Sequence, residues 1–202
     1  MNLEALEEVK GFMPYHEGEA LSKWAEKFSN KGPIMEIGTY CGKSTLFLSY
    51  GANKNNQFVY TVDHHMGSEE HQLGEEYHDE DLYDERIEKF NTLPEFLKNI
   101  RSSNLFNYVI PVINNSKEAS KTFSESIGLL FIDGGHSHEA AMCDYNSWKD
   151  KISSGGLLVI HDVFPNPEDG GRPPFEIYST AQKSKDFDDL GIYETLGILK
   201  RI

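Results

Sequence analysis

The chain has 202 residues, and its 19 Lys and Arg against 33 Asp and Glu give a formal net charge of −14. This length, with an apolar fraction of 38%, suits one domain with a single buried core. So acidic a surface repels phosphate, which argues against a nucleic-acid binder and against docking on anionic membranes. Two cysteines are too few for a disulfide framework, and the sequence shows neither a signal-peptide pattern nor an apolar run of about 20 residues. We therefore expect a soluble, cytoplasmic protein.

Short apolar runs alternate with helical patterns along the chain, which indicates a parallel α/β sheet. The first helix is predicted by Leu21, Trp24, Ala25 and Phe28, which follow the i, i+3, i+4, i+7 spacing. Pro111 interrupts the third strand and indicates an edge position or an irregular start for it. The other expected elements are strands at 34–37, 58–62, 108–113, 129–132 and 157–160, helices at 43–50, 93–101, 137–151 and 175–185, and a final hairpin at 191–193 and 196–199.

The negative charge is concentrated in one segment. Residues 69–88 contain ten acidic residues and one basic residue, Arg86, so they carry −9 of the total −14. We interpret residues 66–90 as an acidic insertion and as a candidate lid, because it follows the end of a strand. A second loop, at 164–174, also follows a strand and carries Arg172, a cation available to an anionic acceptor. The expected organisation is a single domain over 1–202, with residues 1–32 as an N-terminal helical cap.

The most informative segment, EIGTYCGKST at 36–45, joins the first strand to its helix. Open α/β sheets bind ligands at such positions. A phosphate-binding P-loop is one interpretation, but only three residues separate Gly38 from Gly42, where that motif has four. A dinucleotide site fits poorly, because Tyr40 and Lys43 occupy two of its glycine positions. The third interpretation is the E-x-G-x-x-x-G loop of class I S-adenosylmethionine-dependent methyltransferases.

From residue 34 to about residue 164 the chain resembles the class I methyltransferases of the "methyltransferase domain 24" type. The resemblance implies an α/β fold, a Rossmann-like three-layer sandwich whose mostly parallel seven-stranded sheet has an antiparallel last strand. The motifs that carry it are EIGTYCGKST (36–45), VDHH (62–65), NS (115–116), FIDGGHSHE (131–139) and GGLLVIHDV (155–163).

The resemblance implies S-adenosyl-L-methionine as the cofactor. Glu36 would help to hold its amino group, and Asp63, at the end of the second strand, would accept hydrogen bonds from both ribose hydroxyls. Asn115 and Ser116 would lie near the adenine. The cofactor-binding residues expected on this basis are Glu36, Gly38, Thr39, Tyr40, Gly42, Ser44, Asp63, His64, Asn115, Ser116 and Asp133.

Asp133 ends the fourth strand and His161 and Asp162 end the fifth, so adjacent strands should present them on one rim. The arrangement resembles that of metal-dependent O-methyltransferases, which implies Asp133, His161 and Asp162 as ligands of a divalent metal. It also implies His136, three residues beyond Asp133, as the base, so the expected catalytic residues are His136 and Asp133. The imidazole shifts the preferred metal from Mg²⁺ towards Mn²⁺, Fe²⁺ or Zn²⁺.

The reaction expected from these residues is direct SN2 transfer of a methyl group to the hydroxyl of a small-molecule acceptor. Two other functions stay open at this point, a P-loop-like nucleotide hydrolase and a non-catalytic cofactor-binding module. Structural roles also stay open, since Asp133 and His136 could cap the following helix and His161 with Asp162 could anchor a loop. Besides the acceptor, the expected partner is a second copy of the chain in a homodimer, with neither nucleic acid nor a membrane.

Overall fold

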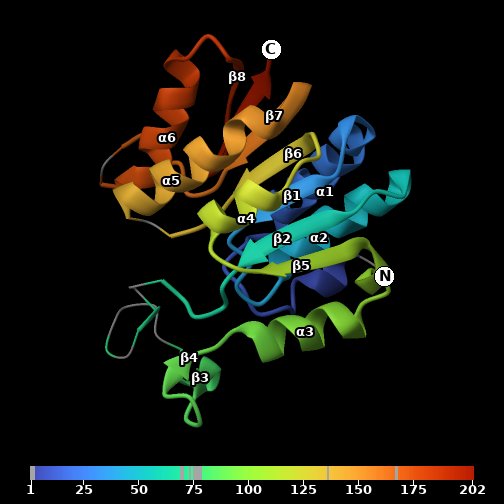
Figure 1. The fold of residues 1–202 in the computed structure, drawn as a ribbon, viewed down its shortest axis with the longest axis vertical. Helices are drawn as coiled ribbons and strands as arrows, with labels where there is room; N and C mark the ends of the chain where they lie inside the picture. Colours follow the sequence, from blue (N-terminus) through green and yellow to red (C-terminus); the bar gives the residue numbers. More distant parts are fainter. Residues whose placement is uncertain (1–2, 69–70, 73, 75–78, 136, 167) are drawn as a thin grey trace.

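The structure, a computed structural model, describes residues 3–68, 71–72, 74, 79–135, 137–166 and 168–202. Its main sheet has seven strands, and Figure 1 shows helices packed on both sides of it. The strands of this sheet are β1 (Ile34–Ile37), β2 (Val59–Asp63), β5 (Val109–Ile113), β6 (Ile127–Ile132), β7 (Ile152–Ile160), β8 (Phe187–Tyr193) and β9 (Leu196–Arg201).

The spatial order of the strands is β5-β2-β1-β6-β7-β9-β8. Every residue of β1 and β6 is buried, as expected for central parallel strands that are covered on both faces. β1 pairs in parallel with β2 and β6, whereas β9 runs antiparallel to both β7 and β8. The expected fold class is therefore confirmed, including the reversed last strand. Pro111 lies in β5 at the edge of the sheet, also as expected.

The helices form two outer layers. Side chains of α1, α2 and α3 belong to one buried apolar cluster and those of α4, α5 and α6 to the other, with the sheet between them. The α-helices are α1 (Tyr15–Phe28), α2 (Lys43–Ala52), α3 (Leu93–Ser102), α4 (Ser116–Thr122), α5 (His138–Trp148) and α6 (Arg172–Lys183). Short 3-10 turns are η1 (Leu3–Leu6), η2 (Ser29–Lys31), η3 (Asn53–Asn55), η5 (Glu80–Leu82), η6 (Phe106–Tyr108) and η7 (Lys149–Lys151).

Several expected boundaries were wrong, and helix α4 was not expected at all. Strand β8 begins at Phe187 rather than at 191. The fifth expected strand begins at Ile152 rather than at 157, because the chain passes through a bulge instead of a turn. Gly155 has a φ of +70° there, and the pairing register between β6 and β7 shifts at the same place. Helix α6 begins at Arg172 rather than at 175, because prolines are tolerated in a first helical turn, where backbone N–H groups have no partner within the helix.

Part of the acidic insertion is folded, which the sequence analysis missed. It contains a two-stranded antiparallel sheet of β3 (Tyr83–Asp84) and β4 (Lys89–Phe90), which Figure 1 shows away from the main sheet and close to the start of α3. Leu82 and Phe90 are 6% and 1% exposed and cluster with Cys41 of the glycine loop. The hairpin is thus attached to the glycine loop by apolar contacts. Of the insertion, the structure describes residues 66–68, 71–72, 74 and 79–90.

Within the described ranges, no helix is both long enough and apolar enough to cross a bilayer. In Figure 1, β2 runs towards the left-hand side, where the chain continues into the insertion. That side is the carboxyl edge of the parallel strands, and it carries the residues described next.

Candidate active site

The loop between β1 and α2 has a shape that requires glycine at two positions. Gly38 and Gly42 have φ values of +85° and +88°, which side chains disfavour. A Cβ on Gly38 would lie 2.0 Å from the carbonyl oxygen of Asp133, and one on Gly42 would lie 2.9 Å from the ring of Phe96. The loop therefore passes directly against the end of β6 on one side and against α3 on the other.

Glu36, in β1, lies fully buried on the α2 side of the sheet. Its Oε2 accepts hydrogen bonds from the hydroxyls of Thr45, at 2.5 Å, and Thr61, at 2.6 Å. The described residues form no hydrogen bond to Oε1, although the Ser44 hydroxyl lies nearby. Burial raises the pKa of Glu36 to about 7, against the opposing effect of these hydroxyls. A buried oxygen without a donor is costly, so Oε1 suits a ligand group that carries an N–H.

Asp63, at the end of β2, ties the glycine loop to the neighbouring strand. Its Oδ2 accepts the backbone N–H groups of Thr39 and Tyr40 at 2.9 and 3.0 Å, and Oδ1 accepts that of His65 at 2.7 Å. A carboxylate oxygen accepts up to two hydrogen bonds, so, counting the bonds from described residues, Oδ1 keeps capacity for one more donor. The structure thus gives Asp63 a structural role at the end of β2, and the remaining capacity of Oδ1 suits one ribose hydroxyl rather than the two that were expected.

Tyr40 joins the glycine loop to two segments from elsewhere in the chain. Its backbone has a φ of 51°, and its ring lies 5.2 Å from that of Phe12, 5.8 Å from His71 and 6.4 Å from Phe90. Thr39, beside it, is buried and shares a short hydrogen bond with Thr61. The N-terminal segment and the insertion therefore meet over this loop.

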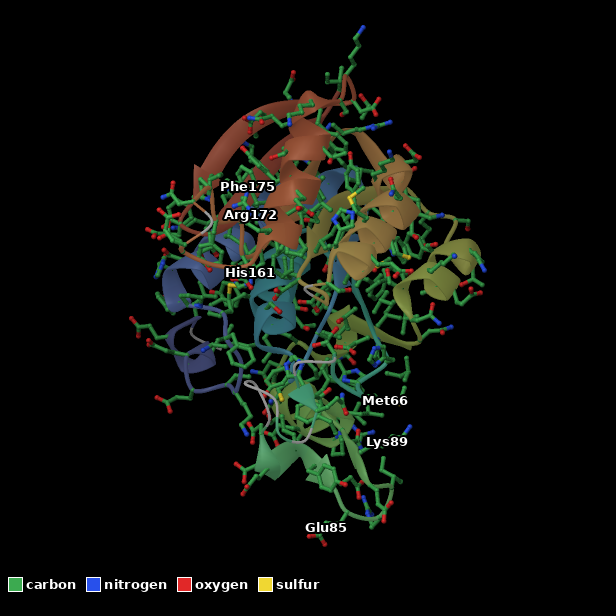
Figure 2. All side chains as sticks on the ribbon, turned by 90° about the vertical axis from the view of Figure 1, so that its left-hand side faces the viewer. Met66, Glu85, Lys89, His161, Arg172 and Phe175 are labelled. Atoms are coloured by element: carbon green, nitrogen blue, oxygen red, sulfur yellow. The ribbon has the colours of Figure 1, made fainter. Side chains whose placement is uncertain are left out.

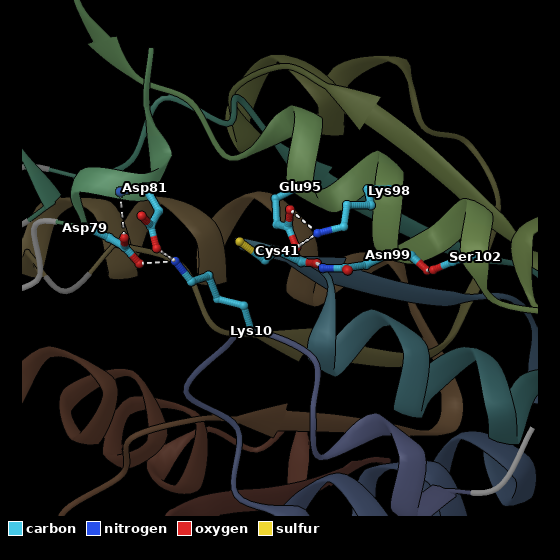
Figure 3. A network of polar contacts seen from close by, with 8 residues as sticks. All are labelled: Lys10, Cys41, Asp79, Asp81, Glu95, Lys98, Asn99 and Ser102. Atoms are coloured by element: carbon cyan, nitrogen blue, oxygen red, sulfur yellow. Dashed lines mark hydrogen bonds and ion pairs between the residues drawn. The ribbon is translucent and has the colours of Figure 1, made fainter. Parts of the chain in front are cut away.

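An ion pair reinforces the same junction. Figure 3 shows Lys10 of the N-terminal segment reaching Asp79, at 2.5 Å, and Asp81, at 3.5 Å, in the insertion. On the other side of the loop, Asn99 of α3 donates a hydrogen bond of 2.9 Å to the carbonyl of Cys41. Polar and aromatic contacts together hold the loop from both sides.

The residues expected near the adenine have partners within the fold. Asn115 caps α4 by accepting the N–H of Glu118 at 2.9 Å, and Ser116 accepts the indole N–H of Trp148 at 2.8 Å. His64, in the loop after β2, is exposed, and its Nδ1 accepts the N–H of Met66 at 3.1 Å. Their roles towards a cofactor stay predictions.

Asp133, His161 and Asp162 meet at the ends of β6 and β7, as expected. One ligand atom from each lies within 4.8 Å of the others. His161 is 6% exposed, and its Nδ1 lies 2.9 Å from Asp133 Oδ1 and 3.4 Å from Asp162 Oδ2. Burial alone would lower the pKa of His161, but the charge of Asp133 and hydrogen bonds to the surrounding carboxylates raise it well above its usual value. Asp162 has a φ of +56°, a left-handed conformation that is uncommon outside glycine.

Sequence reasoning missed Glu17, which lies on the far side of the same imidazole. This residue of α1 is 1% exposed, and its Oε2 lies 3.1 Å from His161 Nε2. Its Oε1 accepts the backbone N–H and the hydroxyl of Thr195, each at 2.8 Å. Burial raises the pKa of Glu17, but these hydrogen bonds outweigh that effect and lower it below its usual value. The signal in the sequence is that Glu17 precedes Leu21 by four residues and so lies on the apolar face of the helix.

Asp144 of α5 is a second buried carboxylate that the sequence analysis missed. It is 7% exposed, and burial raises its pKa to about 6. A Cβ on Gly134 would lie 2.6 Å from its Oδ2, so the glycine makes room for the carboxylate. Asp144, Asp133 and His161 are among the residues lining a cavity of about 10 Å³, which is about the smallest that holds one water molecule.

Two further expectations concern the loops at this edge. His136 lies outside the described residues, so its role as the base stays a prediction. Arg172 donates a hydrogen bond of 2.9 Å to the carbonyl of Phe164, and its guanidinium carbon lies 4.3 Å from the centre of the Phe175 ring. Figure 2, which faces the carboxyl edge, shows Arg172 and Phe175 above His161, with Met66 lower, towards the hairpin. Arg172 therefore organises its own loop.

Comparison with known families decides between the interpretations of the glycine loop. A family model described as "Methyltransferase domain" matches residues 35–163, more than half of the chain. The chain belongs to this methyltransferase family. This match identifies it as a class I S-adenosylmethionine-dependent methyltransferase and favours the third interpretation of the glycine loop.

Solved structures share the fold of this methyltransferase at low sequence identity. SAH-bound Podospora anserina methyltransferase PaMTH1 has a TM-score of 0.69 and 14% identity, with 99% of this chain and 86% of that chain covered. The O-methyltransferase NovP has a TM-score of 0.67 and 14% identity, with 99% of this chain and 88% of that chain covered. The O-methyltransferase from Bacillus cereus in complex with SAH has a TM-score of 0.65 and 15% identity, with 99% of this chain and 90% of that chain covered.

Proposed function

We propose that this methyltransferase transfers a methyl group to a hydroxyl oxygen of a small-molecule acceptor, assisted by a divalent metal bound to Asp133, His161 and Asp162. The observation that carries the proposal is the contact between Gly38 and the backbone of Asp133. It joins the loop that serves the methyl donor in this family to the cluster of metal-ligating side chains. Donor and acceptor would therefore meet at one place on the carboxyl edge.

The residues of the loop fit the cofactor. Oε1 of Glu36 is buried and has no hydrogen bond from the described residues, so the amino group of the cofactor would supply the missing donor. Asp63 Oδ1 keeps capacity for one ribose hydroxyl. Because S-adenosylmethionine supplies a methyl group already activated by its sulfonium, the protein has to align the acceptor and accept its proton.

The donor set of the cluster fits a divalent cation. Two carboxylates and an imidazole can each direct one ligand atom to a common point, and the imidazole favours Mn²⁺, Fe²⁺ or Zn²⁺ over Mg²⁺. The metal would supply Lewis-acid chemistry that lowers the pKa of the acceptor hydroxyl. We assign the general-base role to His136, on its position three residues after Asp133 in the sequence.

The choice of oxygen as the methylated atom has two supports. A hydroxyl is far too weak an acid to ionise alone, so a metal and a base are useful together, whereas an amine needs neither. Two of the structures that share the fold are O-methyltransferases by name, at 14% and 15% identity. Both supports point to the same class of acceptor.

Calorimetry tests the binding part of the proposal. S-adenosylmethionine and S-adenosylhomocysteine (SAH) should both bind, and ATP, the control, should not. Mn²⁺ should bind to the wild-type protein and more weakly to Asp133→Asn. Binding of ATP without either S-adenosyl compound would overturn the proposal, and a protein that binds the cofactor but neither Mn²⁺ nor Zn²⁺ would overturn its metal part.

Transfer of a labelled methyl group tests the reaction. A panel of small hydroxyl compounds that includes catechols and sugars should contain an acceptor of the label in the presence of Mn²⁺, and a chelator should stop the transfer. Asp162→Asn should lose transfer by at least about 100-fold while its affinity for SAH stays within a few-fold. Asp188→Asn, on the exposed part of β8, is the matched control. Transfer to amines alone, unaffected by the chelator, would contradict O-methylation.

A further inference from the structure

Glu17 is an acid at a position where the fold otherwise places apolar side chains. It shares the inner face of α1 with Leu21 and Ala25, both fully buried. Burying a carboxylate is unfavourable unless it is paired and hydrogen-bonded. Both of its oxygens are used, Oε1 by Thr195 and Oε2 by His161, so its partners explain why it is tolerated.

The two nitrogens of the His161 imidazole face different groups. Nε2 lies 3.1 Å from Glu17, whereas Nδ1 faces Asp133 and Asp162, the two other members of the metal-ligating cluster. Only one nitrogen of a metal-binding histidine is a ligand, and the other N–H is usually donated to a carboxylate or carbonyl, which fixes the ring and its tautomer. Glu17 stands where such an acceptor is needed.

We propose that Glu17 is a positioning residue, which accepts the Nε2–H of His161 and thereby keeps Nδ1 directed at Asp133 and Asp162 as a ligand atom for the divalent cation. The inference rests on the metal site of the proposed function. It adds that the site depends on α1 and on the turn between β8 and β9, both of which lie outside the residues 35–163 that define the family.

Glu17→Gln separates positioning from packing. The backbone N–H of Thr195 can only donate, so it holds the amide oxygen of the E17Q side chain and turns the NH₂ group towards His161. That NH₂ group donates a hydrogen bond to Nε2 of His161, so the neutral ring carries its proton on Nδ1. A protonated Nδ1 cannot bind a cation. The variant thus keeps the shape of the contact and reverses its polarity.

The experiment titrates Mn²⁺ and, separately, Zn²⁺ into the cofactor-free wild-type protein, E17Q and two controls by calorimetry. E17Q should bind the metal about 10- to 100-fold more weakly, while its affinity for SAH stays within about two-fold of the wild type. Glu19→Gln removes an exposed charge from the same helix and should change neither affinity. Thr195→Val removes one hydrogen bond to Glu17 and should lower the melting temperature without weakening metal binding.

The outcomes separate this inference from the function on which it rests. Unchanged metal affinity in E17Q would overturn the inference alone, and so would equal losses of metal affinity in E17Q and Thr195→Val, which would indicate a purely structural contact. Failure of the wild-type protein to bind either ion would overturn the metal site and the inference together. Should E17Q fail to fold, Glu17→Asp, whose carboxylate is too short to reach Nε2, should show the same loss.

Discussion

Glu36 is a carboxyl whose charge state depends on burial. It is fully buried, and its pKa is raised from 4.5 to about 7 because the ionised form has lost its hydration. A pKa raised on folding means that the carboxyl favours the folded state most when it is protonated. That contribution is complete below pH 4.5 and is lost as the pH rises through 7.

Replacing Glu36 with Gln removes this dependence on pH. Relative to the wild type, E36Q should become more stable by about 3 kcal/mol as the pH rises from 4.5 to above 7, since each pKa unit is worth about 1.4 kcal/mol. Urea unfolding at a series of pH values measures the difference. Glu85→Gln, at an exposed position in the hairpin, serves as the control and should show no such trend. Parallel pH profiles for E36Q and the wild type would contradict the raised pKa.

Asp63 ties the glycine loop to β2, so its substitution should affect both the stability of the fold and cofactor binding. It accepts three backbone N–H groups, which an amide can replace only in part, because the NH₂ group of the variant would face donors. Asp63→Asn should therefore lose about 1–3 kcal/mol of stability and bind SAH at least about 10-fold more weakly. Thermal unfolding and calorimetry measure these effects. If stability falls and affinity does not, Asp63 supports the loop but does not hold the ribose.

Among the elements, the hairpin of β3 and β4 illustrates the limits of sequence reading. The long strands and amphipathic helices were predicted because their apolar spacing matches the period of a strand or a helix. The hairpin strands have two residues each, too few to show a period, and they follow or lie within a segment of the sequence, 69–88, that contains ten acids. What holds them is the contact of Leu82 and Phe90 with Cys41, which lies 41 and 49 residues earlier in the chain, and no local pattern encodes this contact.

The residues of the candidate site could be predicted from the sequence only in part. Asp133, His161 and Asp162 came together as expected, because parallel neighbouring strands must end on one edge. Glu17 was missed because its partners, His161 and Thr195, are 144 and 178 positions away, and a lone acid on an apolar helix face says nothing about them. Topology can be read from periodicity, whereas a buried charge can be understood only with its partners.

The junction of the N-terminal segment with the hairpin can be measured through Lys10 and Asp79. Both are partly exposed, so their ion pair should contribute only about 0.5–1 kcal/mol. A double-mutant cycle of Lys10→Met and Asp79→Asn, followed by urea unfolding, should give a coupling energy of this size, and about 0.5 M salt should reduce it. The exposed pair of Lys23 and Glu19 on α1 is the control, with weaker coupling. A coupling of zero at low salt would mean that the ion pair of Lys10 and Asp79 does not stabilise the junction.

For the molecule as a whole, the net charge of −14 affects how ligands arrive. S-adenosylmethionine carries a sulfonium and an ammonium against one carboxylate, so it is a net cation, whereas SAH is neutral overall. Electrostatic attraction should therefore speed the association of the first and leave the second largely unaffected. Stopped-flow measurements should show the association rate of S-adenosylmethionine falling about two- to five-fold as salt rises from 20 to 300 mM, roughly, with a much smaller change for SAH. Equal salt dependence for the two compounds would contradict this account.

The contact between Glu17 and Thr195 also bears on how the protein can be divided. It bridges the first long helix and the last hairpin, and both flank the part that resembles other family members. A shortened version cut back to 35–163, or a chimaera that exchanges only this central part, would keep every recognisable motif yet lose the support behind His161. The family match covers the central part of the chain, whereas the part that has to be expressed or transplanted reaches from α1 to β9.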